Sequence, residues 1–251
     1  MATNTAPTGP LPSAFDTTIG NNSFATQSCG DFFRRFLANT TFRECLPVSL
    51  LLATSKSWFN AAKSFVSLTR ALDASCAVDA AKCAALLSQF NRELVSKDVC
   101  SKDLDAQNPL ALNAQTGFVA YQFVHDAACL KNPDTGSYCM ADALASEATV
   151  ANTFVYHIAL GAPLPGSTRP ECNKCLQATM EVYSRAAAIK DQPLAKTYLP
   201  TAQQINIGCG PAFVSERVKS AALPVSASRS PQLYLALPLL ALMTLFLEGF
   251  L

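Results

Sequence analysis

The sequence lacks the short motifs that mark several common enzyme classes. It contains no GxSxG nucleophile elbow, no HExxH zinc motif and no phosphate-cradling glycine loop. These absences do not exclude an enzyme, although they make one less expected. A basic patch with interleaved aromatic residues is also missing, and 19 Lys and Arg nearly balance 18 Asp and Glu, so no nucleic-acid partner is expected.

A pattern typical of β-strands is missing as well, because no run of β-branched residues alternates with polar ones. Apolar residues instead recur at helical spacing over residues 58–72 and 80–94. The pair Asn108 and Pro109 opens another predicted helix, which turn residues close at 131–136. Further helices are predicted at about 138–159, 171–189 and 193–207. The sequence therefore predicts an all-α fold.

No signal peptide is visible at the start of the chain. Such a segment has a basic region followed by about 7–15 apolar residues, whereas residues 1–28 are rich in Thr, Ser, Pro, Asn and Gly. We interpret residues 1–28 as a disordered arm. Two explanations stay open: the sequence begins at an internal methionine, or the protein is cytosolic and tail-anchored with reduced thiols. The cysteines, glycosylation motifs and tail of the chain favour the first.

The single long apolar run lies at the C-terminus, from Leu233 to Leu251, with Glu248 as its one formal charge. Small residues at Ser220 or Ser226 and a short polar spacer precede it, as in a glycosylphosphatidylinositol (GPI) attachment signal, in which a lipid replaces the tail. The alternatives are a retained membrane anchor and a buried core helix. A retained span is disfavoured because Pro238 interrupts the run and no basic residue follows it.

The rest of the chain organisation follows from composition. Residues 29–214 are predicted to form a single cysteine-rich α-helical domain, since roughly 180 residues are enough for a sizeable core. Residues 215–232 are interpreted as a linker that carries the candidate GPI attachment site. Residues 233–251 form the GPI signal or membrane segment.

The chain contains ten cysteines, and an even number of this size is typical of an extracellular disulfide framework. Their pairing is open, although the turn between Cys129 and Cys139 makes that pair the easiest to predict. Asn21 and Asn39 stand in N-glycosylation sequons, which fit the same compartment. The predicted disulfide cysteines are Cys29, Cys45, Cys76, Cys83, Cys100, Cys129, Cys139, Cys172, Cys175 and Cys209.

Cys172 and Cys175 form a CxxC motif where a helix is predicted to begin. A helix N-terminus stabilises a thiolate, so this pair could exchange disulfides. No βαβ pattern surrounds the motif and eight other cysteines compete for pairing, which favours structural cystines. Neither redox catalysis nor metal binding is the favoured interpretation.

Two other groups could carry chemistry. His125 and Cys129 lie one helical turn apart and could supply two zinc ligands or a base–thiol pair, but two ligands do not make a site. The other histidine, His157, lies in an apolar run. Three carboxylates cluster around Cys100 and could do acid–base work only across a cleft, so we interpret them as a solvated loop rim: Asp98, Asp103 and Asp105. No catalytic residue, metal ligand or cofactor site is therefore assigned.

Five ordered blocks together resemble an uncharacterised, cysteine-rich domain of fungal cell-surface proteins, catalogued as a domain of unknown function. The resemblance covers about 29–214 and implies a secreted α-helical domain that a signal peptide usually precedes and a GPI signal follows. It supplies no catalytic residues. The blocks that carry it are Ser28–Phe33, Cys45–Ser55, Tyr138–Cys139, Arg169–Cys175 and Ile207–Val214.

The sequence thus predicts a non-enzymatic, GPI-anchored protein on the outer face of the plasma membrane or in the cell wall, reached by the secretory pathway. Its expected partners are the membrane, through the lipid or the tail, and a cell-wall polysaccharide or protein. Two alternatives are kept. A helical carrier of lipid or haem would need an apolar cavity, and a surface hydrolase or CxxC oxidoreductase would need convergent carboxylates in a groove or an exchanging cysteine pair.

Overall fold

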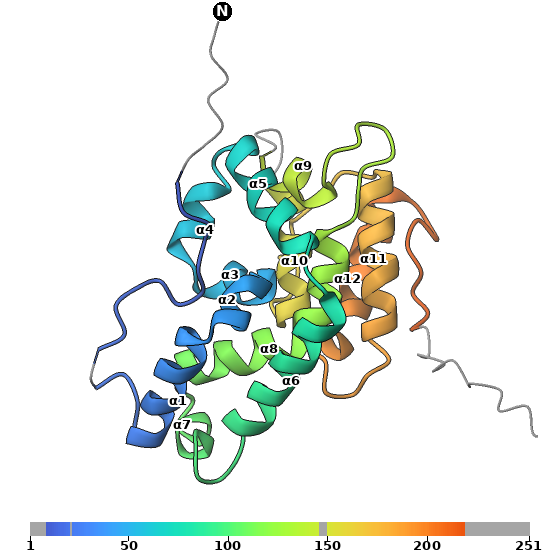
Figure 1. The fold of residues 1–251 in the computed structure, drawn as a ribbon. Coiled ribbons are helices and arrows are strands. Elements are labelled where there is room, and N and C mark those ends of the chain that lie inside the picture. Colours follow the sequence, from blue (N-terminus) through green and yellow to red (C-terminus); the bar gives the residue numbers. More distant parts are fainter. Residues whose placement is uncertain (1–8, 21, 146–149, 219–251) are drawn as a thin grey trace, which may run out of the picture. The chain divides into compact units, whose positions relative to one another are not determined.

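The computed structural model describes residues 9–20, 22–145 and 150–218, and it is helical, as predicted (Figure 1). An isolated antiparallel bridge between Lys131 and Tyr138 is the β-pairing in this part of the chain. The α-helices are α1 (Gln27–Ala38), α2 (Thr40–Cys45), α3 (Val48–Thr54), α4 (Lys56–Ala61), α5 (Phe65–Cys76), α6 (Ala80–Leu94), α7 (Ser101–Asp105), α8 (Pro109–Ala128), α9 (Cys139–Ala145), α10 (Ala151–His157), α11 (Lys174–Ala186) and α12 (Leu194–Cys209), with the 3-10 helix η1 (Ile158–Leu160) after α10.

The longest helix, α8, is buried along most of its circumference. Asn108 caps its first turn by accepting hydrogen bonds from the N–H groups of Leu110 and Ala111, and Pro109 occupies the first turn, where no intrahelical donor is needed. Its buried side chains are mostly alanine, with Gly117 among them. Helices α3, α6 and α11 pack against it. A helix that is apolar all round belongs in the interior, and here it forms the centre of the domain.

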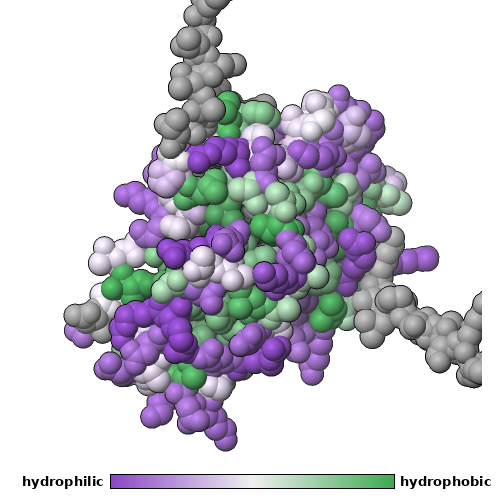
Figure 2. All heavy atoms as spheres, viewed as in Figure 1, coloured by the Kyte–Doolittle hydropathy of each residue, from purple (hydrophilic) through white to green (hydrophobic). Residues whose placement is uncertain are grey.

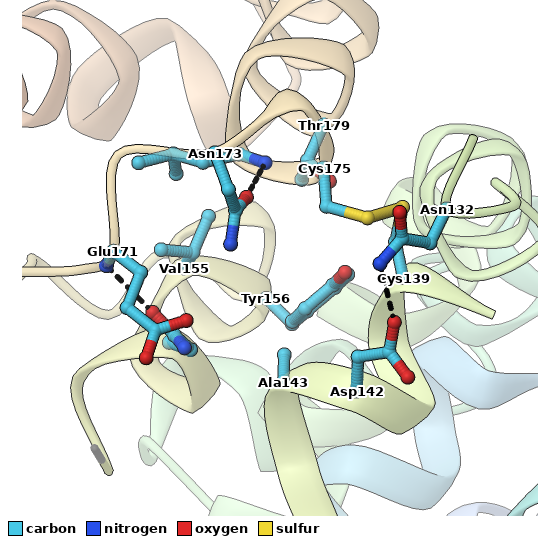
Figure 3. A pocket seen from close by; sticks show the side chains of 12 residues that line it. Asn132, Cys139, Asp142, Ala143, Val155, Tyr156, Glu171, Asn173, Cys175 and Thr179 are labelled. Atoms are coloured by element: carbon cyan, nitrogen blue, oxygen red, sulfur yellow. Dashed lines mark hydrogen bonds between the residues drawn. A yellow bond between two sulfur atoms is a disulfide. The ribbon is translucent and has the colours of Figure 1, made fainter. Parts of the chain in front are cut away.

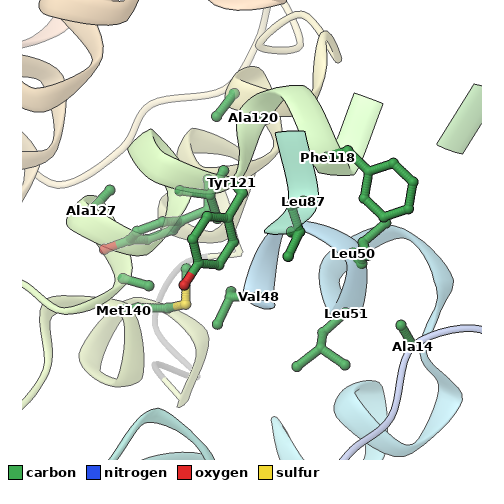
Figure 4. Close-up of a cluster of buried hydrophobic side chains, with 14 of the residues drawn as sticks. Ala14, Val48, Leu50, Leu51, Leu87, Phe118, Ala120, Tyr121, Ala127 and Met140 are labelled. Atoms are coloured by element: carbon green, nitrogen blue, oxygen red, sulfur yellow. The ribbon is translucent and has the colours of Figure 1, made fainter. Parts of the chain in front are cut away.

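Helix α3 packs tightly against α8 at Gly117. A Cβ at this position would lie 2.7 Å from Leu50 Cγ, far inside van der Waals contact. Leu50 and Phe118 lie side by side in the buried cluster of Figure 4. The hydrogen side chain of Gly117 is therefore a packing requirement, since only glycine leaves room for Leu50.

An aromatic cluster fills the space between α1, α2, α6 and α8. Phe36 is its centre, with ring centroids 5.1 Å from Phe42, 5.4 Å from Phe118 and 5.9 Å from Phe90. Most of these pairs meet edge to face, which their quadrupoles favour. Phe15, from the N-terminal segment, joins the cluster 6.0 Å from Phe36. The cluster ties the first third of the chain to the central helix.

The disordered arm predicted for residues 1–28 is wrong from residue 9 onward. Phe15 is 6% exposed, so this segment contributes to the core. Asp16 accepts hydrogen bonds from the N–H groups of Lys56 and Ser57, both at 2.7 Å, and so caps the start of α4. Composition suggested disorder because polar residues dominate the segment, but one aromatic anchor and one carboxylate are enough to hold it. Residues 1–8 lie outside the described residues.

Two predicted helices are each divided. The helical spacing over 58–72 breaks at residues 62–64, because Ser64 caps a new helix by accepting from the N–H of Ser67. The helix predicted at 138–159 is present as α9 and α10, and residues 146–149 lie outside the described part. Helices α6, α8, α11 and α12 match the predictions closely.

All ten cysteines form disulfides, as predicted, and each bridge joins residues 36 to 71 positions apart. The first three bridges connect α1, α2, α5, α6 and the ends of α7 and α8, and the last two connect α9, α11 and α12. No bridge crosses residues 130–138. The pairs are Cys29–Cys100, Cys45–Cys83, Cys76–Cys129, Cys139–Cys175 and Cys172–Cys209.

The predicted Cys129–Cys139 pair is wrong. Backbone hydrogen bonds already close the turn between them, with Cys139 N–H donating to Leu130 O at 2.8 Å and Asn132 N–H to Ser137 O at 2.7 Å. The two sulfurs are therefore free to bond outward. Cys129, at the end of α8, bonds to Cys76 on α5, and Cys139, at the start of α9, bonds to Cys175 on α11.

We predict that Gly117→Ala destabilises the domain by about 1–3 kcal/mol, because overpacking against Leu50 outweighs the higher helix propensity of alanine. Urea unfolding followed by circular dichroism measures the change. Gly30→Ala in α1 is the matched control, since its Cβ would lie 3.5 Å from Phe24, an ordinary contact. Equal stability of the two variants would contradict the close approach of α3 and α8.

We predict that the stabilisation contributed by Asp16 disappears in acid. Partial burial raises the pKa of Asp16, but the hydrogen bonds from Ser57, Lys56 and Ser55 together lower it below its ordinary value of 3.8. Its contribution is therefore complete above about pH 4 and is lost as the pH falls through the lower folded pKa. The stability difference between the parent and Asp16→Asn should shrink over this range. Asp98→Asn, which changes an exposed carboxylate, is the control.

Candidate functional site

The CxxC segment leads into α11, with Cys172 before the helix and Cys175 in its first turn, and its two cysteines bond to different helices. Cys172 pairs with Cys209 at the end of α12, and Cys175 pairs with Cys139 at the start of α9. Between them, Asn173 caps α11 by accepting from the N–H of Leu176 at 2.8 Å. The two sulfurs therefore form no bond with each other, and the segment joins α9, α11 and α12, as the structural interpretation predicted.

A small polar pocket lies beside this segment, between α9, α10 and α11 (Figure 3). Asn132 donates from Nδ2 to Asp142 Oδ2 at 2.7 Å, and Asn152 Oδ1 accepts from the Glu171 N–H at 2.8 Å. The Tyr156 ring forms part of the floor. Burial, together with the negative charge of Asp142, raises the pKa of Tyr156, so the phenol stays protonated at physiological pH.

Two carboxylates, Asp142 and Glu171, line this pocket, which is the arrangement that the hydrolase alternative requires. Its volume is about 50 Å³, which is room for a few water molecules and not for a sugar ring. Asp142 is also held by Asn132, whereas Glu171 is an exposed residue at the rim. The pocket can order water and fix the ends of three helices. No sequence motif marks this pocket, although Glu171 stands next to the CxxC motif.

His125 is almost fully buried, with Nε2 3.3 Å from Ser75 O and 3.7 Å from Cys129 Sγ. Because Cys129 is bonded to Cys76, no thiol is present for a base to activate. The ring instead packs over this disulfide, 5.6 Å from the Tyr121 ring. His157 ends α10, half-buried, and burial lowers its pKa. In the described ranges no group of three His, Cys, Asp or Glu residues could hold a metal.

The carboxylates around Cys100 do not form one solvated rim. Asp98 and Asp105 are exposed, but Asp103 is 0% exposed. It accepts hydrogen bonds from the Ala25 N–H and from Thr26 Oγ1, both at 2.7 Å. The rim interpretation is therefore wrong for Asp103, which holds the N-terminal segment against α7. Ala25 and Thr26 lie more than seventy positions earlier in the chain, so the local sequence around Asp103 carries no signal for this contact.

A groove of about 670 Å³ runs between α1 and the N-terminal segment. Its floor is aromatic, because the rings of Phe15 and Phe24 pack 5.3 and 4.6 Å from that of Phe33. Thr17, Gln27 and Arg34 add polar groups to its lining. This volume is within the range of small-ligand sites, roughly 300–1,000 Å³. The groove is the feature that best fits the carrier alternative, which stays a prediction.

A family comparison covers most of the described chain. Residues 10–218 match the model of a domain of unknown function, DUF7729. The chain belongs to this family. No curated protein and no solved structure matches it. The DUF7729 match begins near residue 10, consistent with the packed N-terminal segment, so the folded part of the chain starts earlier than the predicted boundary at 29.

The modification sites proposed for this DUF7729 protein are only partly within the described residues. Asn39 is half-buried at the start of α2, and its Oδ1 accepts a hydrogen bond from the Phe42 N–H at 2.9 Å. Nδ2, the atom to which an N-linked glycan is attached, takes no part in this capping bond. Asn21, Ser220, Ser226 and the tail 233–251 lie outside the described residues. Within the described part, no helix combines the length and apolar character that a membrane span requires.

We predict that Cys172→Ser destabilises the domain by about 2–5 kcal/mol, a large share of the roughly 5–15 kcal/mol that keeps a domain folded, because α12 loses its bond to the loop before α11. Thermal melting and secreted yield measure the effect. The double variant Cys172→Ser/Cys209→Ser should be equally destabilised, which separates the lost bridge from the unpaired thiol. The nearby Glu171→Gln should melt like the parent. A stable Cys172→Ser protein that has lost a thiol-exchange activity would contradict the structural role.

Proposed function

We propose that this DUF7729 protein is a non-enzymatic domain displayed on the outer cell surface, where it acts by binding, and that a GPI lipid attached near its C-terminus anchors it. The observation that carries the proposal is the use of all ten cysteines in five disulfides. Disulfides persist outside the cytosol and are rare within it, and they are typical of secreted and extracellular proteins. Reduced thiols in a cytosolic, tail-anchored protein fit this arrangement poorly.

The binding interpretation rests on two observations, one about the CxxC cysteines and one about the pocket beside Tyr156. Cys172 and Cys175 are committed to separate bridges, so thiol exchange would have to break a bond between helices. The carboxylate pocket beside Tyr156 has space for water alone. Surface display instead requires a domain that stays folded in an oxidising, protease-rich environment. Long-range disulfides supply that stability, since each closes a loop of more than thirty residues and removes entropy from the unfolded chain.

The spacing of the C-terminal signal favours Ser220 over Ser226 as the attachment residue. A GPI signal has small residues at three successive positions, then a polar spacer of about 8–12 residues, then the apolar tail. From Ser220, the spacer is 223–232, which satisfies this length. From Ser226, the spacer would be 229–232, which is too short. We therefore propose cleavage after Ser220, which removes residues 221–251 and with them the apolar run.

The test is release of the protein from intact eukaryotic cells that express the chain behind a secretion signal. Phosphatidylinositol-specific phospholipase C should release the parent, because the diacyl lipid is its membrane attachment. Ser220→Gln should abolish surface anchoring, since the attachment site accepts small residues. Ser226→Gln is the matched control and should be released like the parent. Peptides from 233–251 in the mature protein, found by mass spectrometry, would overturn the anchor in favour of a retained tail.

A further inference from the structure

The five disulfides differ in how far solvent reaches them. Of the ten cysteines, Cys172 alone is exposed, and its partner Cys209 is half-buried. Each of three other bridges contains a cysteine that is at most 1% exposed, and the His125 ring packs over the fourth. Figure 2 shows mainly hydrophilic surface at the upper right, over the start of α11. Because access to the sulfur limits thiol exchange, Cys172–Cys209 is the bridge that an external thiol attacks first.

The position of Cys172 favours its thiolate form once the bridge opens. Cys172 directly precedes Asn173, the N-cap of α11, so its sulfur is released beside the N–H groups at the start of a 13-residue helix. The positive end of the helix dipole stabilises a thiolate there. The exposed Glu171 carboxylate opposes this effect, but solvent screens its charge.

The other sulfur of the bridge has a cation near it. The Arg169 side chain lies against Gly208, next to Cys209, because a Cβ at Gly208 would lie 3.1 Å from Arg169 Cδ. A nearby guanidinium favours the departure of Cys209 as a thiolate. Both halves of the exposed bridge therefore lie where a negative charge on sulfur is stabilised.

A second disulfide lies three positions along the chain from Cys172. Cys175, in the first turn of α11, bonds to Cys139 at the start of α9, and this disulfide borders the Tyr156 pocket in Figure 3. Two cysteines separated by two residues at the start of a helix have the spacing at which CxxC disulfides form. A thiolate at Cys172 can therefore bond either to Cys209 on α12 or to Cys175 in its own segment.

We propose that Cys172–Cys209 is a redox switch that a small-molecule thiol opens, and that the released Cys172 thiolate then attacks the Cys139–Cys175 bridge. A thiolate R–S⁻ attacks Cys172 Sγ, and Cys209 leaves as a thiolate. A second R–S⁻ attacks the outer sulfur of this mixed disulfide, so that R–S–S–R forms and the Cys172 thiolate is released. This thiolate attacks Cys175 Sγ. The Cys172–Cys175 bond forms, and Cys139 leaves and takes a proton from solvent.

The steps balance as one two-electron reduction. Two R–SH molecules are oxidised to one disulfide, and their electrons and protons appear as two protein thiols, at Cys139 and Cys209. The exchange between the two bridges transfers no further electrons. Both disulfides that join the CxxC segment to other helices are lost, so the start of α9 and the end of α12 are released. The switch depends on these bridges and not on the lipid anchor. On a cell surface, it would make this end of the domain responsive to extracellular thiols.

The test treats the purified, oxidised protein with reduced glutathione. The reaction is stopped with acid at successive times, free thiols are alkylated, and peptides are mapped by mass spectrometry without further reduction. Cleavage after Lys174 separates Cys172 from Cys175, so a bond between them appears as a linked pair of neighbouring peptides. We expect this linked pair, with Cys139 and Cys209 alkylated about ten-fold faster than the cysteines of the other three bridges, because access controls exchange.

A double variant and a melting measurement separate the two steps. Cys139→Ser/Cys175→Ser removes the bridge that the thiolate attacks, so alkylation should appear at Cys172 and Cys209. The glutathione-treated parent should melt below the oxidised Cys172→Ser/Cys209→Ser variant, because that variant keeps the bond between α9 and α11. Equal melting temperatures would contradict the loss of both bonds.

Cys76→Ser/Cys129→Ser is the matched control, because it removes a bridge outside the CxxC segment and should keep the alkylation pattern of the parent. The peptide map of the parent tests the switch without any variant. Alkylation of Cys172 and Cys209 in the parent, with the bond between α9 and α11 intact, would show simple reduction and overturn the exchange. Earlier alkylation in one of the other three bridges would overturn the exposed bridge as the point of attack.

Discussion

The small side chains of α8 are the constraint on which the arrangement of the other helices depends. Because alanines and Gly117 form much of its surface, α3 and α6 approach its backbone closely, and α11 packs on it from the second half of the chain. Larger residues would hold these helices at a greater distance. At Gly117 a Cβ would lie 2.7 Å from Leu50 Cγ, so α3 packs against α8 at a residue without a side chain, directly before Phe118 of the aromatic cluster.

The disulfides act on this packed arrangement in two groups. Three bridges hold the helices that precede residue 130, and two hold α9, α11 and α12. The turn at 131–138 separates the groups and is held by hydrogen bonds of its backbone and side chains, without a disulfide. Both halves nevertheless pack on α8, so hydrophobic burial joins what covalent bonds do not. Cys172 and Cys175 are three positions apart, but Cys172 bonds to the end of α12 and Cys175 bonds to the start of α9. Both bonds therefore lie within the second group.

The candidate sites differ in whether they hold segments of the chain together or face outward. The polar pocket around Tyr156 and the buried carboxylate of Asp103 serve to hold segments together, the first at the ends of three helices and the second at the N-terminal segment. The groove beside α1 faces outward and combines aromatic side chains with polar ones, Gln27 and Arg34 among them.

Local sequence determined the helical class, the start of α8 at Asn108, and the oxidised state of the cysteines, because periodicity, capping and an even cysteine count are properties of neighbouring residues or of composition. Only the tertiary structure decided which cysteines pair, since Cys129 and Cys139 are close in sequence but face α5 and α11. It also decided that Asp103 is buried and that Ala14 and Phe15, within the predicted disordered arm, are part of the core. These outcomes depend on partners tens of residues away in the chain. The local sequence around a carboxylate is the same whether it lies on a solvated loop or beneath a folded segment.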